Sequence, residues 1–269
     1  MIYLSSFTLP EETESNPNAY PYRLFRQRRG ETLFFDKITV LYGDNGSGKS
    51  TLLNLIANKL GLEGAEAVSN NPWDRYAQRF LAGCSWAMGE DEKGKKVKKL
   101  SRESRYIKSE DILYEIKKTQ QENVLQDDIR YRYRKEGYTG EQLEGMSKEL
   151  WWRGEVEKFA REKYSNGEIS MQIFEQYLIP DSLYLLDEPE TSLSPAHQVQ
   201  LANQMNELAR LLRTQFIIAT HSPFMLGTLQ GAIYDLDQPH LMRRRWSELE
   251  NIRYFYQFFK EHDKEFENQ

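Results

Sequence analysis

The residues with the clearest chemical meaning form the octapeptide GDNGSGKS, at residues 43–50. Its spacing fits G-x-x-x-x-G-K-[ST], in which the backbone N–H groups of a glycine-rich loop cradle phosphate oxygens. Lys49 is placed to reach the β- and γ-phosphates of a nucleotide, and the hydroxyl of Ser50 is placed to hold Mg²⁺. The sequence therefore predicts a nucleotide site formed by Gly43, Asp44, Asn45, Gly46, Ser47, Gly48, Lys49, Ser50 and Thr51.

The residues on either side of this loop predict the elements that hold it. The apolar run ITVLY, at residues 38–42, is typical of a buried strand, and residues 49–60 have the spacing of a helix. The segment GLEG at residues 61–64 supplies the glycine that commonly ends a helix. A loop between a strand and a helix N-terminus adds the positive end of the helix dipole to the phosphate site.

A second group of candidate residues lies in LYLLDEPE, at residues 183–190. The apolar run Leu183–Asp187 suits a strand that is buried on both faces of a parallel sheet. Such a strand delivers Asp187 to its carboxyl end, where we expect it to hold Mg²⁺. Glu188 comes next, so its carboxylate is expected to orient and deprotonate an attacking water.

A third candidate, His221, lies in THSP at residues 220–223. The preceding run QFIIAT predicts another buried strand, and residues 195–213 lie before it as a crossover helix that begins with a proline. Because the carboxyl ends of parallel strands meet at one edge of a sheet, we expect His221 to contact the γ-phosphate and to respond to its loss.

The bulk composition limits the class of protein. The 269 residues are 39% hydrophobic and 29% charged, with a formal net charge of −5, which gives no overall attraction to nucleic acid. No apolar run approaches the roughly 20 residues that span a bilayer. The N-terminal residues lack the pattern of a signal peptide, and one cysteine, Cys84, cannot form an internal disulfide. These features predict a cytoplasmic protein.

The order of the motifs resembles that of ABC-type ATPases. The motifs are the P-loop, SNGE at Ser165–Glu168, LLDEPE, SLSP at Ser192–Pro195 and THSP. The resemblance is strongest to the soluble SMC- and RecF-like branch, and especially to a small "predicted ATPase" family of AAA/ABC-like proteins. It covers roughly residues 33–60 and 163–236. It implies an α/β fold of the P-loop NTPase type, with a mostly parallel sheet flanked by helices.

Two further parts of the fold are expected around this core. Strands predicted at residues 2–9 and 32–42 indicate an N-terminal antiparallel part. We expect the ATPase core to comprise residues 1–64 and 165–269, and residues 65–164 to form an inserted, mainly helical lobe. Smaller elements are predicted as a strand at 79–87, a helix at 168–178, a strand at 232–236 and an amphipathic helix at 247–263.

The resemblance also implies a mechanism. Two copies pack head to tail, and each ATP lies between the P-loop of one copy and the signature segment of the other. In this chain the signature segment corresponds to SNGE, so that Ser165, Gly167 and Glu168 contact the nucleotide across the dimer, although the usual motif is LSGGQ. By the same resemblance SLSP crosses the dimer seam. Glu110 stands about where such ATPases have a metal-contacting glutamine.

Other interpretations remain open at this stage. The chain is expected to hydrolyse ATP with Mg²⁺ and to serve a DNA-processing or defence-type partner. It is alternatively a module in which ATP binding controls a separate effector, or the ATPase subunit of a transporter. ATP is favoured over GTP because no guanine-reading NKxD motif is present. Three aromatic residues are candidates to stack on adenine: Tyr20, Tyr22 and Phe25.

Four clusters of basic residues suggest binding to nucleic acid through phosphate contacts, although acidic residues surround them. They lie at residues 23–29, 93–99, 130–135 and 243–245. Asp235 and Asp237 alternate at the end of a predicted strand and would share a face, but no further acidic cluster accompanies them, so a nuclease-type metal site is disfavoured. Trp151, Trp152 and Phe159 are expected to pack inside the helical lobe or to contact a partner.

Overall fold

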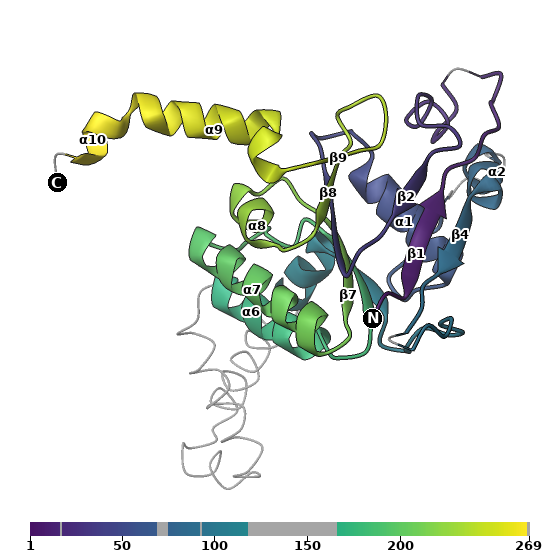
Figure 1. The fold of residues 1–269 in the computed structure, drawn as a ribbon, viewed down its shortest axis with the longest axis horizontal. Coiled ribbons are helices and arrows are strands. Elements are labelled where there is room, and N and C mark those ends of the chain that lie inside the picture. Colours follow the sequence, from purple (N-terminus) through teal and green to yellow (C-terminus); the bar gives the residue numbers. More distant parts are fainter. Residues whose placement is uncertain (17, 69–74, 92, 118–165, 268–269) are drawn as a thin grey trace, which may run out of the picture.

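A computed structural model describes residues 1–16, 18–68, 75–91, 93–117 and 166–267 (Figure 1). A six-stranded sheet forms the centre of the described chain, in the order β5-β6-β7-β3-β8-β9. Its first five strands are parallel, and β9 pairs with β8 in the antiparallel direction. The strands are β3 (Ile38–Tyr42), β5 (Arg105–Lys108), β6 (Leu183–Asp187), β7 (Gln215–Ala219), β8 (Ala232–Asp235) and β9 (Met242–Arg244).

The central strands are buried on both faces, as their continuous apolar sequences predict. Every residue of β3, β6 and β7 is buried. Alternate side chains enter two separate cores: Leu185 packs on the side of α1, whereas Leu186 packs on the side of α6, α7 and α8. The helices are α1 (Lys49–Leu60), α6 (Asn166–Tyr177), α7 (Pro195–Leu211) and α8 (Pro223–Thr228).

The predicted boundaries of the helices that frame the site agree closely with the structure. α1 begins at Lys49 and ends at Gly61, whose left-handed backbone (φ 64°) lets its N–H bond to the carbonyls of Ala57 and Asn58. α7 starts with Pro195, and the side chain of Ser194 accepts a hydrogen bond from the N–H of His197. These caps fix where each helix meets the carboxyl ends of the strands.

A second sheet of three antiparallel strands lies on the α1 side of the core, in the order β2-β1-β4. Its strands are β1 (Leu4–Thr8), β2 (Thr32–Phe34) and β4 (Ser85–Met88), and α2 (Tyr76–Gly83) precedes β4. The buried side chain of Gln215 joins the two sheets. Its Oε1 accepts from the N–H groups of Tyr3 and Leu4 at 2.7 and 2.9 Å, and its Nε2 donates to the carbonyls of Leu4 and Asp36 at 2.9 and 3.0 Å.

The expected helical lobe at residues 65–164 differs from the structure in its first part. β4 pairs with β1, and β5 is the edge strand beside β6, so residues 85–88 and 105–108 belong to the two core sheets. The strand predicted at 79–87 is helix up to Gly83 and strand only from Ser85. These short strands were hard to predict because their pairing partners are distant in sequence. Residues 118–164 lie outside the described residues, so a lobe there stays a prediction.

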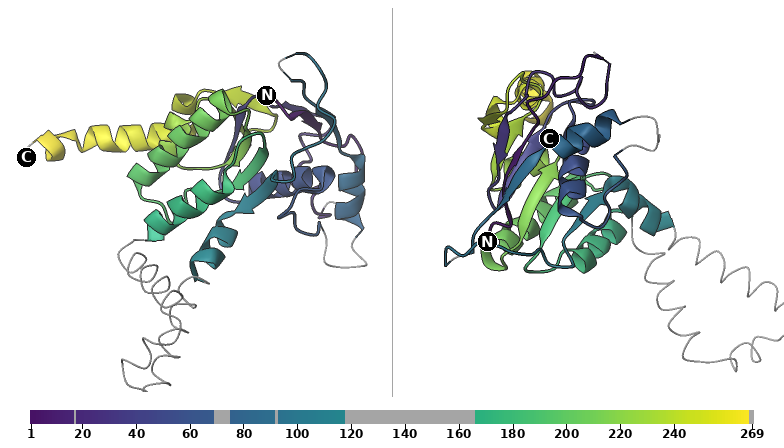
Figure 2. Two further views of the ribbon diagram at one scale, coloured as in Figure 1. Left: turned by 90° about the horizontal axis from the view of Figure 1, so that it is seen from below. Right: turned by 90° about the vertical axis from the view of Figure 1, so that its right-hand side faces the viewer.

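The C-terminal residues leave the core as a rod. A short 3-10 helix, η1 (Trp246–Glu248), leads into α9 (Glu250–Glu261) and α10 (Asp263–Glu267). α9 projects away from the sheets (Figure 1 and the left panel of Figure 2). None of the described helices is long and apolar enough to cross a bilayer.

Candidate functional site

The phosphate-binding loop lies between β3 and α1, as the sequence predicts. Gly48 caps α1 with φ 102°, in the left-handed region that favours glycine, and a Cβ there would lie 2.9 Å from Cδ2 of Leu24. A Cβ on Gly43 would lie 2.5 Å from Oγ of Ser47. Both glycines are therefore required by the shape of the loop, whose tip at residues 44–46 is exposed to solvent.

Lys49 lies inside this loop and is 5% exposed. Its Nζ donates to the carbonyl oxygens of Gly43 at 2.7 Å and Asp44 at 3.2 Å, and it lies 3.9 Å from Oε1 of Glu188. A cation in this position can neutralise the charge on the β- and γ-phosphates of a nucleotide. The structure thus brings Lys49 close to Glu188.

Asp187 lies at the carboxyl end of β6 and is 8% exposed. Its Oδ2 accepts from the hydroxyl of Tyr106 at 3.1 Å, and Ser50 also donates to its carboxylate. Burial raises the pKa of Asp187, whereas the hydrogen bonds from Ser50 and Tyr106 lower it. Its buried Oδ1 has no hydrogen-bond partner among the described residues.

The unpartnered oxygen of Asp187 beside the hydroxyl of Ser50 fits the donor set of Mg²⁺. This ion takes oxygen ligands, and at nucleotide sites it is usually held by one or two protein groups together with waters and phosphate oxygens. Among the described residues no group of three or more His, Cys, Asp or Glu side chains could hold a metal alone.

Glu188 has an unusual backbone that directs it into the site. Its φ of 49° is in the left-handed region, which costs a non-glycine residue about 1–3 kcal/mol. Its N–H still bonds to the carbonyl of Ala219 at 2.9 Å, and its Oε1 lies 3.5 Å from Nδ1 of His221. The side chain is 30% exposed, so water can reach it. A carboxylate in this position can act as a general base.

The loop that carries His221 is held by Glu190. The buried Oε1 of Glu190 accepts from the hydroxyl of Thr220 at 2.6 Å and from the N–H of His221 at 3.2 Å. Burial raises the pKa of Glu190. The hydroxyl of Ser222 donates to Oε1 of Gln198 at 2.6 Å. Sequence reasoning missed Glu190, although it lies in the same DEPE motif as the two predicted acids.

The described part of the signature segment packs against the start of α7. Gly167 is buried, and a Cβ there would lie 2.9 Å from Nδ1 of His197 and 3.4 Å from the carbonyl oxygen of Ser192. Glu168 lies in the first turn of α6. Ser165 lies outside the described residues. The structure therefore places Gly167 beside the SLSP segment and His197 against Gly167, a contact that no motif of the sequence predicts.

Two residues on the C-terminal side hold the phosphate loop from outside. The N–H of Asp44 donates to both carboxylate oxygens of Asp237, at 2.8 and 3.1 Å. The side-chain amide of Asn251, in α9, donates to Oδ1 of Asp44 at 2.8 Å. Asp235 accepts from the N–H of Asp237 at 3.0 Å and pairs with Arg244 at 3.6 Å. Both acids are thus engaged in protein contacts, which accounts for them without a nuclease-type metal site.

The remaining candidates lie at the margin of the site. Glu110 is exposed in the helical turn after β5, and its described interaction is electrostatic, with Lys108, so a metal contact stays a prediction. Phe25 and Tyr22 are buried against Phe80. Tyr20 is 51% exposed, and its hydroxyl lies 2.7 Å from Oγ1 of Thr51 at the start of α1. Of the three aromatic candidates, Tyr20 has the ring that a base can reach.

The sequence of residues 88–227 matches a protein family described as an AAA domain, putative AbiEii toxin, of a type IV toxin–antitoxin system. This match covers just over half of the 269 residues and includes Asp187, Glu188 and His221. The chain belongs to this family. With the phosphate loop at residues 43–50, this makes it an ATPase-type P-loop domain. The comparison with curated proteins gave no match.

Solved structures of similar proteins are SMC heads and ABC cassettes. A Pyrococcus furiosus Smc head with an extended coiled coil, bound to the C-terminal domain of ScpA, has 14% identity and a TM-score of 0.45, over 96% of this chain and 100% of the other. The dimeric bacterial ABC transporter cassette MJ0796 has 15% identity and a TM-score of 0.45, over 93% and 100%. The Thermotoga maritima SMC head has 13% identity and a TM-score of 0.42, over 87% and 94%.

Several basic residues of this AAA domain are used in internal contacts. Arg28 is buried and donates to the carbonyls of Leu236 and Gln238. The three arginines at residues 243–245 pair with acids, respectively Asp36, Asp235 and Glu248. Arg28 and the three arginines at residues 243–245 thus make structural contacts, and nucleic-acid binding by the four clusters stays a prediction. The cluster at residues 130–135 lies outside the described residues, as do Trp151, Trp152 and Phe159.

Proposed function

We propose that the protein hydrolyses ATP with Mg²⁺. The observation that carries this proposal is the meeting of four side chains at the carboxyl ends of three adjacent strands. Lys49 follows β3, Asp187 and Glu188 end β6, and His221 follows β7. Lys49 and His221 both approach Oε1 of Glu188, at 3.9 and 3.5 Å. A cation, a metal-binding acid, a base and a γ-phosphate contact are the parts that phosphoryl transfer requires.

Each residue has a distinct role in the proposed reaction. Ser50 and the free oxygen of Asp187 hold Mg²⁺, which supplies positive charge to the phosphate oxygens. Glu188 accepts a proton from a water molecule. The oxygen of that water bonds to the γ-phosphorus, and the bond from that phosphorus to the β–γ bridging oxygen breaks. Lys49 stabilises the charge that moves onto the leaving ADP. Tyr20, exposed beside Thr51, is proposed to stack on the adenine.

We also propose that ATP joins two copies head to tail, as the resemblance to ABC-type ATPases implies. The buried contact of Gly167 with His197 and Ser192 supports this proposal, because it packs the signature segment directly against the SLSP segment. The γ-phosphate would then contact both copies, and its loss would release them. The ATPase core is proposed to comprise residues 1–64 and 165–269, together with β4 and β5.

The substitution Glu188→Gln tests the proposed base. It keeps the size and hydrogen-bonding capacity of the side chain but removes its basicity. We expect ATP affinity within about threefold of wild type, turnover lower by about 10²–10⁴-fold, and accumulation of an ATP-bound dimer. Turnover is measured by phosphate release, and the dimer by light scattering. Glu207→Gln, on the exposed side of α7, is the matched control. Native turnover in Glu188→Gln would refute the assignment.

A second candidate function is an ATP-controlled switch for a separate effector. The family description, which names a putative toxin of a type IV toxin–antitoxin system, favours this candidate. In this case nucleotide-dependent dimerisation, rather than the products of hydrolysis, would control a defence-type or DNA-processing partner. Binding of the partner only to the Glu188→Gln dimer would support it, and equal binding without nucleotide would contradict it. A transporter role would require co-purification with a membrane partner.

A further inference from the structure

The C-terminal rod carries an aromatic face that the described chain does not cover. Five aromatic residues of α9 are between 43% and 70% exposed, and Phe266 in α10 is 64% exposed. The five are Tyr254, Phe255, Tyr256, Phe258 and Phe259. Only Ile252 of α9 is buried, and the helix projects from the core (Figures 1 and 2). Contiguous apolar surface of this extent marks an interaction site.

The aromatic residues follow the spacing of a helix that packs against another helix. Residues 252, 255, 256 and 259 share one face, at spacings of three and four residues. Polar residues flank this stripe, and four of them, Arg253, Gln257, Lys260 and Glu261, also line the groove described below, whereas Tyr254 and Phe258 lie outside it. A helix with one such apolar stripe buries it in most proteins.

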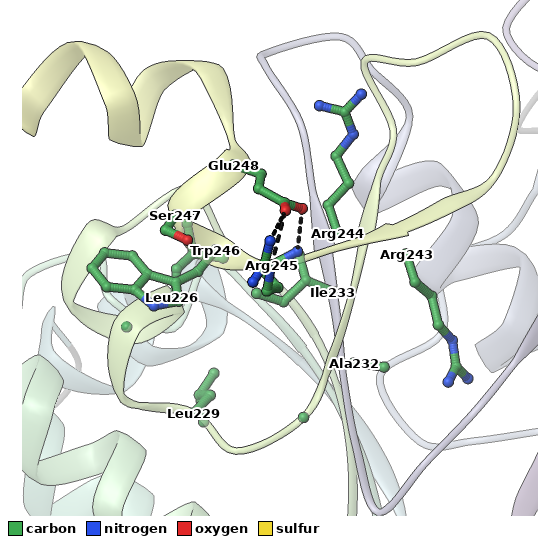
Figure 3. A pocket seen from close by; sticks show the side chains of 12 residues that line it. Leu226, Leu229, Ala232, Ile233, Arg243, Arg244, Arg245, Trp246, Ser247 and Glu248 are labelled. Carbon is green, nitrogen blue, oxygen red and sulfur yellow. Dashed lines mark hydrogen bonds and ion pairs between the residues drawn. The ribbon is translucent and has the colours of Figure 1, made fainter.

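The base of the rod is firmly fixed and forms one wall of a groove. Trp246 packs over α8, so that its ring lies 3.6 Å from the Cβ position of Gly227, while Arg245 and Glu248 pair at the start of η1 (Figure 3). A cavity of about 1370 Å³ lies between this base and the apolar face of α9, and Phe224 and Trp246 contribute to its lining. The groove is therefore preformed and large enough for aromatic side chains from another helix.

We propose that this face binds the same face of a second copy of the chain, with the two α9 helices antiparallel and without any need for nucleotide. The available area supports a second copy. Leaving out Tyr254 and Phe258, six aromatic residues of the rod and groove are 43–69% exposed: Phe224, Trp246, Phe255, Tyr256, Phe259 and Phe266. At about 200 Å² for each full side chain they provide about 600 Å² on each copy, so two copies bury about 1,200 Å², the lower end of the range for a stable interface.

The charges also favour an antiparallel pair. The first turn of α9 carries Glu250 and Arg253 and so has no net charge, whereas residues 260–267 at the far end of the rod carry two basic and four acidic side chains. Antiparallel pairing brings each Arg253 toward the acidic end of the other copy, twice in one symmetric interface. A parallel pair would instead place like charges together.

The same charges disfavour a membrane as the occupant. Residues 250–267 contain three basic and five acidic side chains. Helices that lie on membrane surfaces are typically rich in Lys and Arg on the polar face. The rod therefore has the apolar face of such a helix without the charge that draws it to anionic lipid.

The oligomeric state of the full chain without nucleotide tests this proposal. Light scattering at about 20 μM is expected to give a dimer for wild type and for Lys49→Ala, which disables the phosphate loop. The double variant Phe255→Asp/Phe259→Asp is expected to be monomeric with an unchanged circular dichroism spectrum. Tyr254→Asp, at an exposed aromatic residue of the same helix outside the groove, is the control and is expected to remain dimeric.

Three results would overturn the proposal. They are a monomeric wild type without nucleotide, a dimer that withstands the double aspartate variant, and a monomer that binds vesicles of phosphatidylcholine and phosphatidylglycerol through this face. Because Lys49→Ala separates this dimer from the ATP-dependent one, failure here leaves the proposed ATPase activity standing. Loss of ATPase activity in Glu188→Gln likewise does not bear on the rod.

Discussion

Asp187 shows how a single residue of the site is prepared for a cation. Its carboxylate is buried, receives hydrogen bonds from Ser50 and Tyr106 on one side, and keeps Oδ1 without a partner in the described structure. Burial disfavours the charged form and raises its pKa. A buried carboxylate of this kind lowers the stability of the ligand-free protein but gives affinity for a positively charged ligand.

This predicts that Asp187→Asn stabilises the nucleotide-free protein. Because the pKa of Asp187 is higher in the folded state than in the unfolded state, its contribution to stability falls as pH rises through the folded pKa. The variant lacks this loss, so we expect an advantage of about 1 kcal/mol at pH 7 that disappears below about pH 4. Urea unfolding at a series of pH values measures it. An advantage that grows toward acidic pH would contradict the argument.

At the scale of elements, the site depends on how α6 meets α7. The close approach of Gly167 to His197 leaves no room for a side chain. Because Gly167 lies in a helix, alanine there would suit the backbone and clash only with its neighbour. The contact can therefore be tested separately from helix stability.

We expect Gly167→Ala to reduce ATP turnover about tenfold or more, by moving His197 and the adjoining SLSP segment, while ATP affinity stays within about threefold. Adding His197→Ala removes the clash and is expected to restore most of the turnover. A double-mutant cycle of turnover and nucleotide affinity measures this coupling. Additive effects of the two substitutions would show that the contact does not act on the site.

The sequence predicted the elements that surround the nucleotide site better than the connections between them. The glycine-rich loop, the apolar strands and Pro195 determine local structure, so α1, β6, β7 and α7 lie close to the predicted positions. β4 and β5 are four residues each and pair with strands distant in the chain, so their local sequence carried little information. The same applies to Asn251, which reaches Asp44 from 207 residues away.

At the scale of the whole molecule, Gln215 joins the parallel sheet to the antiparallel one. Its four hydrogen bonds engage backbone groups of Tyr3, Leu4 and Asp36 at the seam. A glutamine at the start of an apolar strand looks unremarkable in sequence. Its importance depends on the arrangement of two sheets, which no local pattern encodes.

We expect Gln215→Leu to lower the free energy of unfolding by about 3 kcal/mol, because buried donors and acceptors lose their partners. Chemical denaturation monitored by circular dichroism measures the change, and Gln200→Leu, at an exposed position of α7, is the control. A loss below about 0.5 kcal/mol would show that the seam tolerates the gap. Tryptophan fluorescence should report any earlier separation of the antiparallel sheet, since Trp86 lies in β4.

The rod that starts beside Asp44 affects how copies of the chain can assemble. If both proposed contacts form, every copy has two different interfaces, one through α9 and one through bound triphosphate. Copies linked alternately by the two contacts either close into a ring or grow into a fibre, depending on the angle between the two symmetry axes. In either case the mass of the particles in solution depends on how much ATP is available.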